Sequence, residues 1–300
     1  MPRVPRAVAH IRLIRNQSTM RIMETLSNPP WKKEVSKILQ KNLDDGNKAS
    51  LNFVLATIKR GSIPRPSART VVFRGFVGEP KESEHPKKLP DGNPPAESSL
   101  ILVSTDALMS KVGELEESNG AFEVCWWHAG TNQQIRFNGT AHVYRKDGKI
   151  PFPEKHLNRY IRTQGEWKWE HEYHRLWSSH RPAMRGSFRN PQPGTPLNFE
   201  KEQKLRVVEL DPEDDSPEAR EAKTRFSMLV LEVKQLEILS LDPPPVSNPF
   251  LDTRADPVVG RTTSMDTRGR RRREYRHGEF GSDLGSYTIM PLNSDHGESP

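Results

Sequence analysis

The chain has 300 residues, a formal net charge of +7 and 26 prolines. This length allows one large domain or two small ones with a substantial core, and the mean hydropathy of −0.79 indicates globular structure with disordered ends. The longest apolar run, around residues 99–103, is far too short to cross a bilayer, so we expect no membrane association. The lone Cys125 excludes an internal disulfide and fits a reducing compartment, the cytoplasm or alternatively the mitochondrion.

Both ends of the chain carry basic residues without the pattern of a folded domain. Residues 1–23 contain five arginines and no acid, which is typical of a mitochondrial presequence, of a disordered extension, or of a chain whose true start is a later methionine. The other basic run, "RGRRRRE" at 268–274, is offset by acidic residues and has no aromatic residues interleaved, so a solvated tail is favoured over a nucleic-acid site. We therefore expect an extension at 1–27, a folded domain at 28–243 and a disordered tail at 244–300.

The first half of the domain reads as a helix followed by strands. Residues 29–46 begin with prolines, place apolar residues at helical spacing and end at a glycine, which predicts a packing helix. Short apolar or β-branched runs predict strands at 51–58, 66–76 and 99–106. The proline-rich segment 80–95 predicts a loop, and 108–120 a short helix.

The second half continues with strands at 121–127 and 134–145, helical segments at 153–163 and 168–180, an acidic linker at 211–219 and a last strand at 226–239. Short strands at hairpin spacing with few helices between them indicate a mainly β fold, an antiparallel barrel with helices at its rim. A dinucleotide-binding βαβ unit is disfavoured, because no glycine-rich phosphate loop follows any strand.

Polar residues along three consecutive strand elements suggest an anion site. Thr105 lies where a strand meets a helix start, and Lys111 lies in the first turns of that helix. A helix start, a hydroxyl and an ammonium together suit a phosphate. Arg69 and Arg74 could supply doubly donating guanidinium groups, and the Gln134 amide could bind the edge of a flat heterocycle. Each residue alone means little, and their order along the chain is what favours a site.

Three sequence blocks, "RTVVFRG", "STDxxxxK" and "TNQQIRFNG", resemble those of the pyridoxamine 5'-phosphate oxidase family of FMN-binding split barrels. The chain is most similar to a divergent branch with "CWW" on a central strand, here at 125–127, and "SF" before a Pro-Gly loop, here Ser187–Phe188 and Pro193–Gly194. The likeness covers about Trp31 to Leu241. It implies an antiparallel split β-barrel of six or more strands with Greek-key connections and flanking helices, and a homodimer that holds FMN at its interface.

The resemblance also implies which residues hold the cofactor. The strand from Arg69 to Arg74 would line FMN, with the two arginines at the phosphate or ribityl oxygens and the backbone near Val71 facing the ring. Gln134 would contact the flavin ring. The complete implied set is Arg69, Thr70, Val71, Val72, Arg74, Ser104, Thr105, Ser110, Lys111 and Gln134.

The spacing of Arg69 and Arg74 is a difficulty, because residues five apart in a regular strand point to opposite faces. Three alternatives stay open. A bulge before Gly75 could break the alternation, one arginine could act through its backbone, or one could serve the site of the partner subunit.

The chain departs from the family pattern at positions that matter for activity. Ser110 stands where the oxidases commonly have an arginine, and Leu108 stands where the divergent branch often has one. The late substrate-binding signature of the oxidases is missing, and "REYRHGEF" at 273–280 is a poor substitute. We therefore expect an FMN-dependent oxidoreductase whose substrate is unknown, not specifically vitamin B6 oxidation. The alternative is a flavin- or ligand-holding protein without turnover, and nucleic-acid binding through the tail is less favoured.

No catalytic residue is named, because in a flavoprotein the cofactor carries the redox chemistry. We also expect no metal site. His171 and His174 are close enough to share a metal, but "HEYH" is one residue short of the zinc-protease spacing and suits the polar face of a helix.

Overall fold

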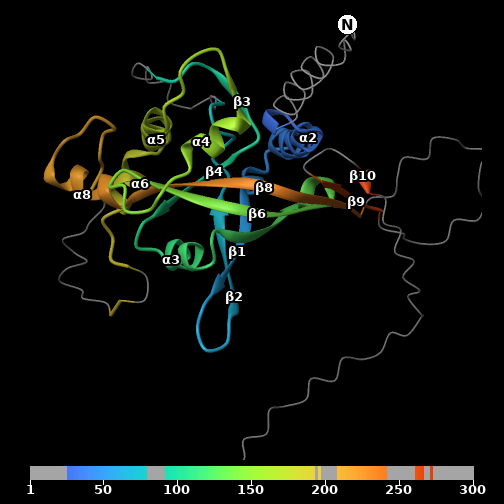
Figure 1. The fold of residues 1–300 in the computed structure, drawn as a ribbon, viewed down its shortest axis with the longest axis horizontal. Coiled ribbons are helices and arrows are strands. Elements are labelled where there is room, and N and C mark those ends of the chain that lie inside the picture. Colours follow the sequence, from blue (N-terminus) through green and yellow to red (C-terminus); the bar gives the residue numbers. More distant parts are fainter. Residues whose placement is uncertain are drawn as a thin grey trace, which may run out of the picture.

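The computed structural model describes residues 26–79, 92–192, 195–196 and 208–241, and the backbone of 261–266 and 271–272. Within these ranges, one large antiparallel sheet has the strand order β10-β9-β8-β6-β5-β1-β2, with β4 also paired to β8. Figure 1 shows α4 and α5 on one side of β6 and β8, and α3 on the other. The strands of this sheet are β1 (Asn52–Lys59), β2 (Arg65–Val72), β4 (Ile101–Asp106), β5 (Ala121–His128), β6 (Gln133–Arg145), β8 (Phe226–Ser240), β9 (Arg261–Asp266) and β10 (Arg271–Arg272).

The sheet curls because the chain leaving β2 pairs with β4. The Arg74 N–H donates to the Leu102 carbonyl at 2.9 Å, and the Leu102 N–H donates to the Gly75 carbonyl at 2.9 Å. Phe76 forms a bridge with Ile101. β2 itself pairs with β1 alone among the described strands, so the curled sheet is split between β2 and β4. The predicted mainly β, antiparallel fold with flanking helices is confirmed.

Two apolar cores lie on the two faces of the curled sheet. Ile101 and Val103 of β4 point into the inner core, whereas Leu100 and Leu102 point into an outer core beneath the helices. β8 is likewise buried on both faces from Phe226 to Val233. A strand covered on both sides is mostly apolar, which explains the apolar run at 228–231, although the polar Ser227 and Glu232 are buried in the same strand.

Aromatic residues fill the inner core. Trp126 is fully buried, packs against Phe53 and Phe73 with ring centroids 5.4 and 5.1 Å away, and donates its Nε1–H to the Ser50 carbonyl at 2.7 Å. The predicted helix at 29–46 forms as α2 (Pro30–Asp44) and buries its apolar stripe against this core. The helices are α2, α3 (Ser110–Glu117), α4 (Glu154–Leu157), α5 (Trp169–Ser178), α6 (Pro182–Ser187) and α8 (Pro217–Arg225), with short 3₁₀ turns η1 (Lys48–Leu51), η2 (Ala129–Thr131) and η3 (Asn158–Tyr160).

Two sequence predictions are wrong in detail. The segment 153–163 is not one helix, because α4 and η3 are followed by β7 (Ile161–Thr163), which pairs with β3 (Ala96–Ser98). The acidic segment 211–219 is not only a linker, since α8 begins at Pro217, where the Ser216 hydroxyl accepts the Ala219 N–H at 3.1 Å and caps the helix.

The ends of the chain are described only in part. The expected disordered tail at 244–300 contains β9 and β10, and β9 pairs with the last six residues of β8. Residues 1–25 and 80–91, and Pro193–Gly194, lie outside the described residues, so the expectations for them are not tested. Among the described helices, none combines the length and apolarity that a bilayer crossing requires.

Candidate functional site

The split between β2 and β4 gathers three of the residues that the sequence singled out. Thr105 lies near the end of β4, Lys111 in the first turn of α3, and Arg69 on β2. The Lys111 Nζ donates to the Thr105 Oγ1 at 3.0 Å. Arg69 lies close enough to Lys111 for its positive charge to act on the ammonium. The predicted convergence of Arg69, Thr105 and Lys111 is therefore present within one chain.

Lys111 is held in an environment that disfavours its charge. Burial and the positive charge of Arg69 together lower the pKa of Lys111 to about 8, against the opposing charges of Asp106 and Glu114. An ammonium that is partly desolvated beside a guanidinium gains from any anion placed next to it. The geometry thus favours an anionic ligand at this end of the split.

Arg69 already has an anionic partner in the chain. Its Nη2 lies 2.6 Å from the Oε2 of Glu114 on α3, and its Nη1 donates to the Ser67 carbonyl at 2.9 Å. Burial alone would raise the pKa of Glu114, but hydrogen bonds from Thr57 and Arg69 outweigh burial and lower it. Sequence reasoning missed Glu114, although its position three residues after Lys111 puts both on one face of α3.

A second polar group lies on the other face of β4. The Arg74 Nε donates to the Ser104 Oγ at 3.2 Å, and that oxygen lies 2.9 Å from the His180 Nε2. The His180 Nδ1 lies 2.6 Å from the Leu176 carbonyl, which can only accept, so Nδ1 carries the proton and Nε2 accepts from Ser104.

His180 is buried and neutral. Burial, helped by the positive charge of Arg74, lowers the pKa of His180 to about 3. Only the fold shows that His180 closes a chain of hydrogen bonds that begins at Arg74. Burial also lowers the pKa of Arg74. This group ties the segment after β2 to β4 behind the split.

The two arginines take opposite sides of the strand, as regular alternation requires. Val71 and Phe73 are both buried in the inner core, so the alternation that includes Arg69 continues past the end of β2. The break comes at Gly75, whose φ of 101° is a left-handed conformation, and it lies after Arg74. A bulge before Gly75 that would bring both guanidinium groups to one face is therefore not observed.

The outer face of the sheet carries the remaining residues. Thr70 pairs with Val54, and Val54 pairs with Cys125 on the next strand, so these three side chains share that face. Gln134 pairs with Trp127 two residues further along. Val54 and Trp127 are 40% and 45% exposed. The face reaches solvent, and its apolar side chains lie beside the exposed ion pairs of Arg136 with Glu123 and Glu237.

The edge of β2 also offers backbone groups. The Phe73 N–H, just after β2, donates at 2.7 Å to the carbonyl of Leu51, the residue just before β1. Because N–H groups alternate in direction along an antiparallel strand, those of Thr70 and Val72 point away from β1, toward the split. The side chain of Val71 is buried, and by the same alternation its N–H and C=O point toward β1, so Val71 presents no hydrogen-bonding group to the split. Ser110 is exposed at the first residue of α3.

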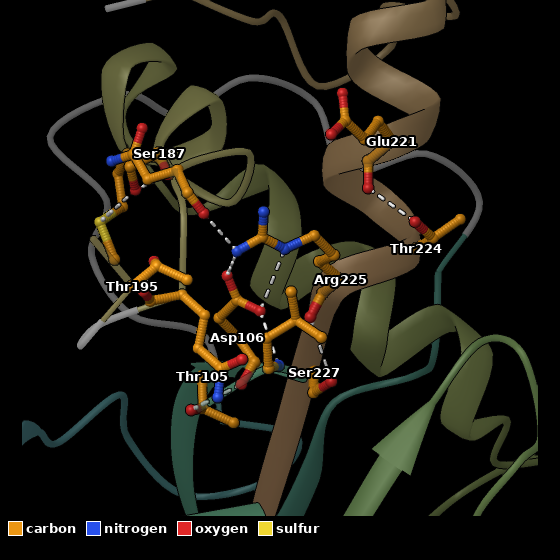
Figure 2. Close-up of polar contacts among 12 residues, drawn as sticks. Thr105, Asp106, Ser187, Thr195, Glu221, Thr224, Arg225 and Ser227 are labelled. Atoms are coloured by element: carbon orange, nitrogen blue, oxygen red, sulfur yellow. Dashed lines mark hydrogen bonds and ion pairs between the residues drawn. The ribbon is translucent and has the colours of Figure 1, made fainter. Parts of the chain in front are cut away.

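A buried ion pair fixes the end of β4 beside this site. Figure 2 shows Arg225, at the end of α8, beside the carboxylate of Asp106. The Arg225 Nη2 pairs with one carboxylate oxygen, and its Nε lies 3.3 Å from the other. The Leu108 N–H also donates to Asp106 at 2.8 Å. The Asp106 carboxylate is therefore bound by Arg225 and by the Leu108 N–H. These contacts fix the end of β4 and with it the neighbouring Thr105.

Comparisons with known proteins agree with the resemblance seen in the sequence. Residues 28–145 match the family model described as "Pyridoxamine 5'-phosphate oxidase, FMN-binding domain", and this range contains all ten implied cofactor residues. The "Pyridoxine/pyridoxamine 5'-phosphate oxidase 2" of Arabidopsis thaliana is 28% identical over 213 residues, which cover 71% of this chain and 83% of that protein.

Among solved structures, the fold is similar to that of a pyridoxamine 5'-phosphate oxidase-related, FMN binding protein from Nostoc punctiforme. The TM-score is 0.55 and the sequence identity 19%, and the match covers 80% of this chain and 92% of the other. At this identity the likeness concerns the fold alone. It agrees with the curled antiparallel sheet and flanking helices described above.

Proposed function

We propose that this protein binds FMN and uses it as a flavin-dependent oxidoreductase, because residues 28–145 match the family model of the pyridoxamine 5'-phosphate oxidase FMN-binding domain. The observation that carries the proposal is the convergence of Arg69, Thr105 and Lys111 at the split between β2 and β4. The substrate stays open.

The phosphate of FMN would lie at this convergence. Lys111 supplies an ammonium, Thr105 a hydroxyl, and the exposed start of α3 at Ser110 supplies backbone N–H groups and the positive end of a helix dipole. Arg69 shares its charge with Glu114, so it contributes to the local field while Glu114 keeps it in position. A phosphate dianion would relieve the repulsion between the two cations, which supports binding at this end.

The flavin ring would lie along the outer edge of β2. The N–H groups of Thr70 and Val72 point toward the split and can donate to ring oxygen or nitrogen atoms. The amide of Gln134 lies on the outer face of β6, three strands from β2 in the order β6-β5-β1-β2, so it would bind the edge of a ring held by the partner subunit. The bound flavin supplies the electron-transfer chemistry, and these residues bind and orient it.

We further propose that the protein is a homodimer with the flavin at the interface. Val54, Ile58 and Trp127 are exposed apolar residues on the strands β1 and β5, and Leu108 is exposed beside the start of α3. Apolar patches of this kind mark protein-protein interfaces more often than free surface. A second copy that covers this face would also exclude water from the ring.

Arg74 and Ser104 stay predicted FMN contacts, and their bonds to one another and to His180 support a further role for them. They hold the segment after β2 against β4, so they would fix the width of the split. Arg74 would contact either the FMN of its own subunit or the FMN of the partner subunit.

The test compares the binding of FMN and of riboflavin, which lacks the phosphate, to the full chain. Binding is measured by the quenching of flavin fluorescence. FMN should bind much more tightly than riboflavin, and Lys111→Met should remove most of that difference. A Trp127→Glu variant should be monomeric by light scattering. A colourless protein that takes up no added FMN would refute the proposal.

The second function is a flavin-holding protein without turnover. Leu108 and Ser110 stand where related proteins carry arginines, and Leu108 is 46% exposed with no charge to offer a substrate. Steady-state turnover with pyridoxamine phosphate and oxygen, or with a reduced nicotinamide, separates the two functions. FMN binding without any turnover over a panel of such substrates would favour the holder.

A further inference from the structure

A second cluster of chemically active side chains lies away from the split, on β6, α4 and β8. His142, His156 and Glu232 each offer a ligand atom, and these atoms all lie within 4.8 Å of one another. The Nε2 of His142 is 3.0 Å from the Oε2 of Glu232, and the Nε2 of His156 is 3.1 Å from that same oxygen. Two imidazole nitrogens thus converge on one carboxylate oxygen.

The fold brings these residues together from distant parts of the sequence. In the pairing of β6 with β8, His142 lies opposite Val230 and Thr140 lies opposite Glu232, so His142 and Glu232 are diagonal neighbours on one face. α4 lies over that face (Figure 1) and carries His156. The glutamate side chain is 7% exposed. The residues are placed by a sheet and a covering helix, which are rigid elements.

We propose that His142, His156 and Glu232 form a binding site for a divalent transition-metal ion such as Zn²⁺ or Fe²⁺. Two imidazoles and one carboxylate are a ligand set that these ions prefer, and three protein ligands leave at least one coordination position open. Ligands at about 2.0–2.1 Å from an ion lie roughly 2.8–3.4 Å from one another in octahedral to tetrahedral geometry. The observed separations of 3.0 and 3.1 Å from nitrogen to oxygen match this spacing.

The surroundings of the cluster suit a metal site in two further ways. The Tyr160 hydroxyl donates to the Oε1 of Glu232 at 2.7 Å, which fixes the carboxylate and turns Oε2 toward the histidines. Partners of this kind orient metal ligands in known sites. His156 is 42% exposed and borders an open hollow of about 730 Å³, so an ion can enter from solvent.

The competing account is that both histidines simply donate their Nε2–H to Glu232. One carboxylate oxygen has two lone pairs and can accept both N–H groups, so the distances of 3.0 and 3.1 Å fit both accounts and metal binding is what separates them. The expectation of no metal site came from His171 and His174, which are three residues apart in the sequence. No spacing pattern could reveal residues 14 and 90 positions away from His142. The proposal does not depend on FMN binding.

The experiment uses untagged full-length protein, stripped with a chelator and then titrated with Zn²⁺ by isothermal calorimetry. We expect one ion per chain. His156→Ala should weaken binding about 100-fold or more, because it removes a direct ligand, and Tyr160→Phe should weaken it about tenfold. X-ray absorption of the Zn²⁺-loaded protein should show two imidazoles and oxygen ligands.

The matched control is His174→Ala, because His174 lies 3.6 Å from Glu170 on the surface of α5 and resembles a histidine-carboxylate pair without the third ligand. This variant should bind Zn²⁺ like the parent. Glu232→Gln tests the buried ligand, and His156→Ala keeps the test valid if Glu232→Gln fails to fold, since His156 is half exposed. No saturable binding at one ion per chain, or binding that His156→Ala leaves unchanged, would overturn the proposal.

Discussion

The affinity for FMN should fall as pH rises through about 8, because Lys111 loses its proton in that range. Burial and the charge of Arg69 lower the pKa of Lys111 to about 8 in the free chain, while Asp106 and Glu114 oppose this. A phosphate dianion beside the ammonium would raise that pKa again. The complex therefore binds one more proton than the free protein above pH 8, and proton uptake links affinity to pH.

The size of the effect follows from the pKa. With a pKa of about 8, roughly nine-tenths of Lys111 is protonated at pH 7 and roughly one-tenth at pH 9. If only the protonated form binds the phosphate well, the Kd for FMN rises about tenfold between these two pH values, with a limiting slope of about tenfold per pH unit. Below pH 7 the dependence on Lys111 should vanish.

The assay is quenching of FMN fluorescence between pH 6.5 and 9.5, with three controls. Lys111→Arg keeps a positive charge over the whole range, so its Kd should stay flat with pH. The Lys111→Met variant should bind FMN weakly, and its Kd should not change with pH. Riboflavin lacks the phosphate, so its Kd for the parent protein should show no change in slope near pH 8. A flat FMN profile for the parent, or a break near pH 8 that persists in Lys111→Arg, would refute the reasoning.

Two further predictions concern stability and are measured by urea unfolding. Gly139→Ala should destabilise the protein by about 1–3 kcal/mol or more, because its Cβ would lie 1.9 Å from the Glu232 carbonyl oxygen. In Gly113→Ala the new Cβ meets no atom within 4 Å, so this variant should stabilise α3 by up to about 1 kcal/mol. Equal effects of the two alanines would contradict the close approach of β6 and β8. The folded-state pKa of His180 lies at about 3, below its ordinary value of 6.5, so the unfolded chain takes up a proton first as pH falls. Stability should therefore drop between pH 6.5 and 3, by at most about 1.4 kcal/mol per pH unit. His180→Gln, less stable at pH 7, should lose that part of the slope, and a parent and variant with parallel pH profiles would show that His180 is not neutral in the fold.

The sequence by itself determined the elements whose pattern is local. The alternation of apolar residues in β5, the helical spacing in α2 and the doubly buried run of β8 follow from which residues each element must turn toward a core. The sequence blocks from Arg69 to Gln134 also indicated the family correctly, because they combine residue types at fixed spacing.

The secondary structure of short segments depends on contacts with residues that are distant in the sequence. β7 is a strand because it pairs with β3, more than 60 residues earlier, although its sequence also suits the end of a helix. The acidic residues before α8 read as a linker, and the helix forms where Ser216 can cap it and its alanines can pack. Local propensity is weak over such lengths, and tertiary pairing overrides it.

The side-chain environments of the site were beyond the sequence for the same reason. Which arginine meets Glu114, which hydroxyl meets His180, and which histidines meet Glu232 depend on the register of the strands and on the docking of α3, α4 and α5 against the sheet. A list of residue types cannot supply those distances, because the free energy of a charge depends on how deeply it is buried and on what lies within a few ångströms. The sequence thus determined which polar groups exist, and the tertiary structure decided which of them are desolvated together.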